Sequence, residues 1–431
     1  MLALAAGSVP ACARSRAATP HQSPIPVPTT AHIERTPYLP DVSDRAWRIW
    51  RAAIVIDAHN DMPTKMLDDG YDADVIHDPG TGKNQGETDL PRLVQSGITG
   101  QFLSDWVDAS YARQTPNGSF ARALVYEDTI HAFVNRHPDQ LLFATTAADV
   151  RRAKSEGKVA ILIGVEGGHA IQNSLDNLRT LYDRGARYMT LTWNNGNDWA
   201  GSSVGVNGTR TGGLTEFGRQ VVHEMNRLGM LVDVSHVSDS TFYDAIAASS
   251  APVIASHSSA RALGGHARDL SDDQLRAIAR NGGVVNVNFY ASFIDPRYRH
   301  DVEAVDRRID DERRTAMAQP GVDSVAVSAR LARERDSLVA AVPPVPLSVL
   351  IDHFDHVARV AGVDHVGIGS DFDGVGGLLP ERMKDVTMLP RIVQGLLDRG
   401  YSDADITKMI GGNMMRVMAQ VLDHRSPADA R

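Results

Sequence analysis

Short apolar runs recur along the chain, and most are separated by segments in which apolar residues return at helical spacing. The run at residues 159–165 is unbroken, which is typical of a strand buried on both faces of a parallel sheet. Segments such as 175–184 and 214–228 have the period of an amphipathic helix. The pattern predicts eight strands, at residues 54–56, 98–106, 159–165, 187–192, 230–234, 252–255, 284–289 and 366–368.

This alternation determines the expected fold class. Strands that alternate with helices predict a parallel sheet, and eight such units predict closure into a (β/α)8 TIM barrel. An open, doubly wound sheet is the alternative. It would be favoured by a glycine-rich dinucleotide fingerprint after the first strand, but that position reads Ala58-His59-Asn60-Asp61.

The pattern also predicts how the chain divides. Residues 41–424 are expected to form the barrel domain, and residues 425–431 a short tail. Within the domain, residues 296–344 are rich in Arg, Asp, Glu and Ala, and 301–317 and 325–340 have the composition of solvated helices. We therefore expect a peripheral helical insertion between the seventh and eighth strands.

The N-terminal 40 residues differ from the rest. Residues 2–12 resemble the end of a bacterial export segment without its basic n-region, and Cys12 follows a loose lipoprotein cleavage box. Residues 13–40 are rich in Ser, Thr, Pro and Ala, as in a flexible tether. The expectation is an exported protein, periplasmic or lipid-anchored through Cys12. The alternatives are a disordered N-terminal tail and a cytoplasmic location.

Composition narrows the possible partners. A net charge of -9 and a pI near 6.0 do not predict the positively charged surface that binds nucleic acid. No apolar run reaches the roughly 18 residues of a membrane-spanning helix. Because Cys12 is the only cysteine, an internal disulfide and a cysteine-based zinc site are both excluded, and a metal would have to be held by His and carboxylate side chains.

Six such side chains fall at predicted carboxyl ends of strands, which converge on one face of a barrel. Each is unremarkable alone, but their coincidence predicts a metal centre. Six ligands are too many for one zinc with an open position and about right for two. Two cations sharing one water would make it hydroxide-like and would polarise a carbonyl, which predicts hydrolysis. The six are His59, Asp61, Glu166, His236, His257 and Asp371.

The motifs around these residues resemble those of the membrane dipeptidase (renal dipeptidase) family of di-zinc peptidases, in the same order from about residue 50 to about residue 420. They read Ile56-Asp57-Ala58-His59-Asn60-Asp61, Gly164-Val165-Glu166-Gly167-Gly168, Asp233-Val234-Ser235-His236-Val237-Ser238, Ser256-His257-Ser258-Ser259-Ala260 and Gly367-Ile368-Gly369-Ser370-Asp371-Phe372-Asp373-Gly374.

The resemblance implies two zinc ions and hydrolysis of dipeptides, L,D as well as L,L, by a metal-bridging hydroxide. It implies that His59 and Asp61 hold one zinc and that His236 and His257 hold the other. Glu166 would bridge the two ions. It also implies a homodimer.

The catalytic and substrate-binding residues follow from the same resemblance. Asp371 would act as the proton shuttle, and Arg268 would hold the dipeptide's free carboxylate with its guanidinium fork. Tyr290 either donates a hydroxyl to that carboxylate or simply packs. Several members of the family have a His where this chain has Trp193, which leaves Asn194 or a metal for the oxyanion contact.

Two other readings of the sequence are kept as alternatives. One is a different binuclear-zinc barrel amidohydrolase that acts on N-acyl amino acids, lactones or phosphoesters. The other is a catalytically silent barrel that only binds. The complete set of predicted ligands argues against the silent barrel.

Overall fold

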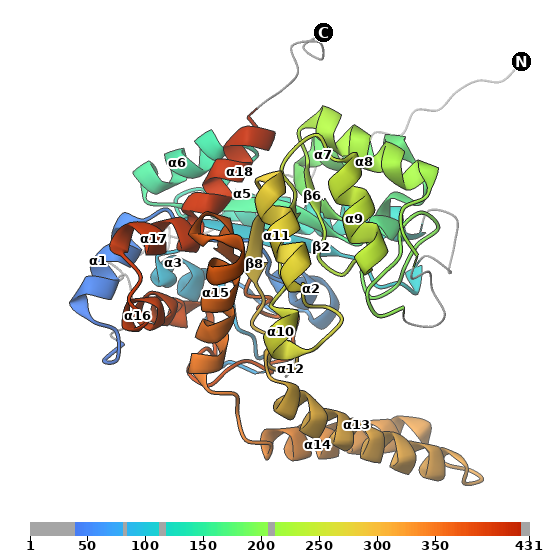
Figure 1. The fold of residues 1–431 in the computed structure, drawn as a ribbon. Coiled ribbons are helices and arrows are strands. Elements are labelled where there is room, and N and C mark those ends of the chain that lie inside the picture. Colours follow the sequence, from blue (N-terminus) through green and yellow to red (C-terminus); the bar gives the residue numbers. More distant parts are fainter. Residues whose placement is uncertain (1–38, 81–83, 112–117, 206–211, 424–431) are drawn as a thin grey trace, which may run out of the picture. The chain divides into compact units, whose positions relative to one another are not determined.

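Eight parallel strands close into a barrel, which confirms the expected (β/α)8 fold (Figure 1). In this computed structural model the strands run in the order β2-β1-β9-β8-β7-β6-β5-β4, and β4 pairs again with β2. The structure describes residues 39–80, 84–111, 118–205 and 212–423. The barrel strands are β1 (Ile56–Asp57), β2 (Gly100–Trp106), β4 (Val159–Glu166), β5 (Ala186–Thr190), β6 (Leu231–Asp233), β7 (Ile254–Ala255), β8 (Val284–Val287) and β9 (Val366–Ile368).

One further strand lies outside the closed barrel. This strand, β3 (Leu141–Phe143), pairs with the first three residues of β4. Strand β5 pairs instead with the last four residues of β4. The hydrophobic pattern did not predict β3, because three residues are too few to show a period. The barrel therefore closes between β2 and β4, which are not consecutive strands.

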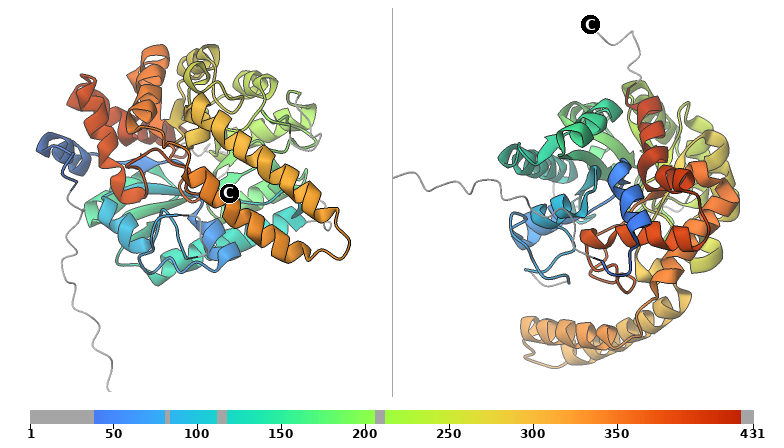
Figure 2. Two further views of the ribbon diagram at one scale, coloured as in Figure 1. Left: turned by 90° about the horizontal axis from the view of Figure 1, so that it is seen from below. Right: turned by 90° about the vertical axis from the view of Figure 1, so that its left-hand side faces the viewer.

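Helices surround the barrel (Figures 1 and 2). Ser402, the N-cap of α17, accepts a hydrogen bond from the backbone N–H of Asp405. Helices α3, α6 and α15 were not predicted, although Asp89 and Thr146 cap the first two. The helices that cover the barrel are α1 (Asp44–Ala52), α3 (Leu90–Ser96), α5 (Gly118–Arg136), α6 (Ala147–Glu156), α7 (Leu175–Arg184), α8 (Glu216–Leu228), α9 (Asp239–Ala248), α11 (Asp272–Asn281), α15 (Leu347–Ala361), α16 (Pro390–Asp398), α17 (Asp403–Thr407) and α18 (Asn413–Val421).

Shorter helices lie in the loops that follow the strands. The segment after β1 begins with α2 (Met62–Thr64) and the π-helical turn η1 (Lys65–Asp69) before it becomes irregular. A 3-10 turn, η2 (Gly168–Ile171), follows β4. Helices α10 (Arg261–Gly264) and α12 (Ala291–Ile294) follow β7 and β8.

A helical pair occupies the segment between β8 and β9, where the sequence predicts an insertion. Its helices are α13 (Pro296–Met317) and α14 (Ser324–Ala340), joined by ion pairs such as Arg335–Asp306 and Arg308–Glu334. The pair lies on the side of the barrel where α10 and α12 lie (Figures 1 and 2). Most of its residues are exposed, as expected for solvated helices.

Alternation along two strands explains how the barrel positions its polar residues. On β4, Leu162 packs in the inner cluster with Phe102, whereas Ile161 belongs to the outer cluster beneath the helices. Because successive side chains point to opposite faces, Gly164 and Glu166 point inward with Leu162. The strand thus ends with a carboxylate directed into the barrel's mouth.

Several expectations concern residues outside the described part of the chain. These are Cys12 and the export segment, the tether up to residue 38, and the tail at 425–431. Within the described residues, no helix combines the length and apolar character that crossing a membrane requires.

Candidate metal centre

The six predicted residues come together at the carboxyl ends of the strands. Glu166 is the last residue of β4, and the other five lie two to four positions beyond β1, β6, β7 and β9. All six are buried, with side chains from five different strand ends. Two of them, His236 and Asp371, have φ near +64° and +62°, a left-handed backbone that is uncommon for non-glycine residues and concentrates at functional sites.

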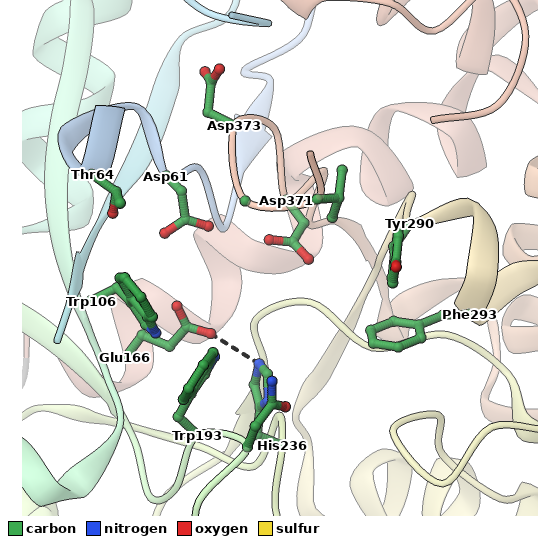
Figure 3. A pocket seen from close by; sticks show the side chains of 13 residues that line it. Asp61, Thr64, Trp106, Glu166, Trp193, His236, Tyr290, Phe293, Asp371 and Asp373 are labelled. Carbon is green, nitrogen blue, oxygen red and sulfur yellow. Dashed lines mark hydrogen bonds and ion pairs between the residues drawn. The ribbon is translucent and has the colours of Figure 1, made fainter. Parts of the chain in front are cut away.

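Glu166 lies between two groups of ligand atoms. Its Oε1 is 2.9 Å from His236 Nε2 and 3.5 Å from His257 Nε2. Its Oε2 is 3.4 Å from His59 Nε2, which is itself 3.4 Å from Asp61 Oδ2. Figure 3 shows Glu166 between Asp61 and His236. Each oxygen of one carboxylate therefore faces a separate set of donors.

The chemistry of these atoms fits metal ions. His59 Nε2 and Asp61 Oδ1 are buried and have no hydrogen-bond partner among the described residues. His236 Nε2 and His257 Nε2 are only 2.9 Å apart, and both side chains are buried. Three overlapping groups keep their ligand atoms within 4.8 Å of one another: His59, Asp61 and Glu166; Glu166, His236 and His257; and His59, His257 and Asp371.

The outer nitrogen of each histidine is engaged, so that Nε2 faces the centre. His59 Nδ1 is 2.7 Å from the Tyr188 hydroxyl, and His236 Nδ1 is 3.1 Å from Asn194 Oδ1. His257 Nδ1 is 2.7 Å from Ser256 Oγ. Such outer contacts fix the tautomer and orientation of a metal-binding imidazole.

Two buried aspartates, Asp233 and Asp57, connect neighbouring strand ends through hydrogen bonds. Asp233 Oδ2 accepts hydrogen bonds from Ser256 Oγ (2.6 Å) and Thr190 Oγ1 (2.5 Å). Asp57 accepts from the backbone and hydroxyl of Ser370, and burial raises the pKa of Asp57 to about 6. Sequence reasoning missed both residues, although each lies two or three positions before a histidine and could have been found by that spacing.

Charge within the centre favours ligands that are ready to bind cations. Burial alone would raise the pKa of Glu166, but the charge of His59 and the contacts with His236 and His257 hold it well below its usual range. Burial and the positive charge of Arg268 lower the pKa of His236 to about 3, so its ring is neutral. A charged carboxylate beside the neutral imidazoles of His236 and His257 is a suitable donor set for zinc.

Asp371 lies beside these ligands and has a different environment. Its Oδ2 accepts a hydrogen bond from Asn288 Nδ2 at 2.8 Å, and its Oδ1 is 3.9 Å from His59 Nε2. Burial, with the nearby charges of Asp61 and Glu166, raises the pKa of Asp371 to about 8. A carboxyl group with this pKa can both release and accept a proton near neutral pH.

A cavity of about 330 Å³ opens onto the centre. Trp106 and Trp193 form one side, and Tyr290 and Phe293 form the other (Figure 3). Each pair is in edge-to-face contact, with ring centroids 5.1 Å and 4.7 Å apart. The volume is at the lower end of the range for small-molecule sites. The other lining residues are Asp61, Thr64, Glu166, Asn194, His236, Asp371, Asp373, Gly374 and Val375.

The predicted substrate-binding residues occupy different positions. Tyr290 and Asn194 line the cavity, and Asn194 also contacts His236. Arg268 is not a lining residue: its guanidinium is buried behind the wall, where it donates to Ser258 Oγ and to the His257 carbonyl and lies 5.8 Å from the centre of the Phe293 ring. Its Nε is buried without a partner among the described residues.

Sequence reasoning also missed Trp106, Phe293, Thr64 and Asp373 as lining residues. Trp106 ends β2, and the rule that placed Glu166 at the end of β4 would have placed it at the mouth of the barrel. Phe293 and Thr64 lie in the short helices α12 and α2, whose positions follow from tertiary contacts that the sequence pattern does not contain.

Comparison with solved structures gives relatives of the same fold over most of the chain. The probable dipeptidase PvdM from Pseudomonas aeruginosa is 27% identical, with a TM-score of 0.72 over 90% of this chain and 100% of that one. The dipeptidase AC, described as a metallo peptidase, is 26% identical with a TM-score of 0.67 over 86% and 99%. A metallo peptidase from Rhodobacter sphaeroides, solved with a phosphinate mimic of the dipeptide L-Ala-D-Ala, is 25% identical with a TM-score of 0.66 over 86% and 99%.

The family match covers nearly the whole chain. Residues 43–431 match the sequence pattern of the membrane dipeptidases, which includes the strands that supply every residue of the centre. The resemblance noted from the motifs is confirmed. The chain belongs to the membrane dipeptidase family, peptidase family M19.

Proposed function

We propose that this enzyme hydrolyses dipeptides with two zinc ions held by His59, Asp61, Glu166, His236 and His257. The family and the dipeptidase relatives support a metal-dependent dipeptidase. The observation that carries the count of two is the position of Glu166, whose two oxygens face separate groups of ligand atoms. A carboxylate in this position can bridge two ions about 3.5 to 4 Å apart.

The reaction would divide between the ions and the side chains. Bound zinc supplies Lewis acidity, which lowers the pKa of water and polarises a carbonyl. Asp371 would take the proton of the attacking water at a carboxylate oxygen and pass it to the departing amine. Its raised pKa and its hydrogen bond from Asn288 support this role, since the bond leaves one carboxylate oxygen free to exchange the proton.

Substrate length and polarity would be set by the cavity. A volume of about 330 Å³ has room for two residues and little more. The buried Arg268 guanidinium lies behind Phe293 and attracts the free carboxylate to that side. Asn194 and Tyr290 line the same cavity and are proposed to contact the peptide.

The comparison with the R. sphaeroides metallo peptidase supports a second substrate class for this enzyme. That relative was solved with a mimic of L-Ala-D-Ala, and it covers 86% of this chain. We therefore extend the proposal to L,D dipeptides as well as L,L dipeptides.

Elemental analysis combined with kinetics tests the proposal. The purified chain should contain about two zinc per molecule and hydrolyse L-Ala-L-Ala and L-Ala-D-Ala. A chelator should abolish both activities, and zinc should restore them. Two zinc without dipeptide cleavage would favour a hydrolase of N-acyl amino acids, lactones or phosphoesters, and a chain that binds no metal would favour the silent binding protein.

Location and assembly are separate proposals. We propose export, with Cys12 as the candidate lipid-bearing residue, because the N-terminal residues resemble an export segment. Mass spectrometry of the mature N-terminus from fractionated cells tests this. We also propose a homodimer, on the family resemblance, which sedimentation analysis of the metal-loaded chain would test.

A further inference from the structure

The two sides of the cavity are both aromatic but differ in charge. None of the described residues that line the cavity is a lysine or an arginine. The buried Arg268 guanidinium lies behind the side formed by Tyr290 and Phe293. On the other side, the carboxylate of Glu166, a proposed metal ligand, lies beside Trp106 and Trp193, and that of Asp371 lies toward Tyr290 (Figure 3).

This difference orients a dipeptide zwitterion. Its carboxylate is drawn toward the Arg268 side, because opposite charges attract strongly where water is excluded, and its amino end is left on the side of the two tryptophans. The residue at the amino end of the dipeptide therefore lies beside Trp106 and Trp193. This orientation rests on the proposed dipeptidase function.

The two indoles present an apolar surface to that residue. Both Trp106 and Trp193 are only partly buried, and both line the cavity. Their edge-to-face contact, with 69° between the ring planes, orients the two indoles against each other. The indole surface that lines the cavity is rigid and apolar, which suits contact with an aromatic or long aliphatic side chain.

Local packing fixes the position of Trp193. A Cβ atom at Gly167 would meet the His169 ring at 2.5 Å and Trp193 Cβ at 3.3 Å, so the turn after β4 lies close to the backbone end of the Trp193 side chain. The ring also lies 6.5 Å from the His236 ring, beside the metal ligands. The indole is therefore held next to the place where the scissile bond would lie.

We infer that Trp106 and Trp193 form the side-chain subsite for the amino-terminal residue of the substrate, and that the enzyme selects dipeptides with an aromatic or large aliphatic residue at that position. The family resemblance implies that several members have a His at the position of Trp193, so an indole at this place is not common to the whole family. The opposite side, Tyr290 and Phe293, receives the carboxyl-terminal residue.

Kinetics with three dipeptides test the subsite in the zinc-loaded, full-length chain. The kcat/KM for L-Phe-L-Ala should exceed that for L-Ala-L-Ala by about 10-fold or more, since burial of a large apolar group in a matching pocket gives discrimination of this order. Trp193→Ala should lower kcat/KM for L-Phe-L-Ala about 10-fold and change that for L-Ala-L-Ala by less than about 2-fold.

Matched variants separate the indole surface from other effects. Trp193→Phe keeps an aromatic face without the indole N–H and should retain most of the preference. Phe293→Ala, on the opposite side, should instead reduce the rate with L-Ala-L-Phe. Tyr243→Ala, an exposed position on α9, should leave all three rates unchanged. Zinc content and circular dichroism of each variant verify that the barrel is intact.

Three results would overturn the inference. Trp193→Ala could raise the rate with L-Phe-L-Ala, which would mean that the indole excludes large side chains. Trp193→Ala could also lower kcat/KM for L-Phe-L-Ala and L-Ala-L-Ala equally. Finally, Trp193→Phe could lower kcat/KM for L-Phe-L-Ala as much as Trp193→Ala does. Either result would mean that the indole N–H acts on the peptide itself.

A binding measurement distinguishes this inference from the proposed function. If the wild-type chain cleaves none of the three dipeptides, the proposed function fails. Calorimetric titration of the zinc-loaded chain then decides the subsite. Tighter binding of L-Phe-L-Ala than of L-Ala-L-Ala, lost in Trp193→Ala, would support it, and equal affinities would overturn it.

Discussion

Glu166 and Asp371 are neighbouring carboxylates in the centre, and their different contacts indicate different roles. Glu166 faces three imidazole nitrogens, whereas Asp371 accepts a hydrogen bond from Asn288 and keeps one oxygen 3.9 Å from His59 Nε2. Geometry alone leaves Asp371 close enough to join His59 and His257 around an ion. A substitution that keeps its shape can separate proton transfer from metal binding.

Asp371→Asn should lower kcat by about 10²- to 10⁴-fold and leave two zinc per chain, because general acid–base catalysis contributes this much. The amide can still accept a hydrogen bond from Asn288, so the local structure should persist. Zinc analysis and steady-state kinetics on the same sample check this. Loss of one zinc together with the activity would instead identify Asp371 as a ligand.

Arg268 acts from behind the cavity wall, which gives a second prediction at this scale. Arg268→Lys should lower kcat/KM for dipeptides about 10-fold or more, because a lysine cannot keep both the bond to Ser258 and the one to the His257 carbonyl. A dipeptide amide, which has no carboxylate, should be cleaved equally by both forms. An equal loss on the amide would mean that Arg268 only supports His257.

At the scale of elements, β4 and β5 show how a strand positions a ligand. An added Cβ at Gly164 would lie 1.9 Å from Tyr188 Cζ, so only glycine allows the tyrosine to cross the barrel and reach His59. The same face of β4 carries Glu166. Strand β4 therefore provides the ligand Glu166 and, at Gly164, the space for Tyr188, which contacts the ligand His59.

Gly164→Ala should weaken zinc binding about 10- to 100-fold by displacing Tyr188 from His59, the usual cost of losing an outer partner of a metal-binding histidine. Competition with a chelator measures this. Tyr188→Phe should have a similar effect, because it removes the same hydroxyl. Gly100→Ala is the matched control, since an added Cβ there would meet its nearest neighbour, Ile56 Cγ1, at 3.3 Å. If the Gly164 variant bound zinc normally, the hydroxyl would not be needed.

Helix α5 buries a second carboxyl pair against the outer face of β2. Both oxygens of Asp105 and one of Glu127 have no hydrogen-bond partner among the described residues, and Glu127 is paired with Arg184 at 2.7 Å. Burial raises the pKa of Glu127 from 4.5 to about 8. Between these values the folded chain keeps a proton that the unfolded chain releases, so stability falls as pH rises.

Glu127→Gln should remove much of this dependence. The wild-type Tm should fall between about pH 5 and pH 8, and the variant's Tm should fall less, because the amide does not titrate. Thermal unfolding across this range provides the measurement. Glu216→Gln, at an exposed site on α8, should behave as wild type. Identical pH curves for Glu127→Gln and wild type would contradict a proton held at this position.

Much of the fold and the centre could be predicted because their signals are local. Apolar runs identified every barrel strand, and His, Asp or Glu at the ends of five of these runs identified all six residues of the centre. The missed parts depend on contacts made in three dimensions. Strand β3 is too short to show a period, Tyr188 reads as one more core residue, and the placement of Arg268 behind Phe293 depends on the loop after β7.

At the scale of the whole molecule, the centre connects strand ends from all round the barrel. Metal bound only by the folded chain adds to its stability, by about 2.7 kcal/mol for each site at a free zinc concentration of 100 Kd. Chelation should therefore lower the Tm by about 5 °C or more. Zinc should restore the Tm. His236→Ala should show a smaller response, and a Tm that chelation does not change would mean that the barrel is stable without its ions.

The pairing of β1 with β9 also sets an order in time. The backbone N–H of Ala58 donates to the carbonyl of Ile368, so the first and last barrel strands meet only when almost the whole chain exists. A ribosome adding about 5 to 20 residues per second needs roughly 15 to 60 s to proceed from His59 to Asp371. Until β9 has been made, Asp371 is absent and the end of β1 has no partner in β9, so the centre is incomplete. We therefore expect the metal to complete its site after synthesis, so that activity depends on the metal available where the finished chain lies.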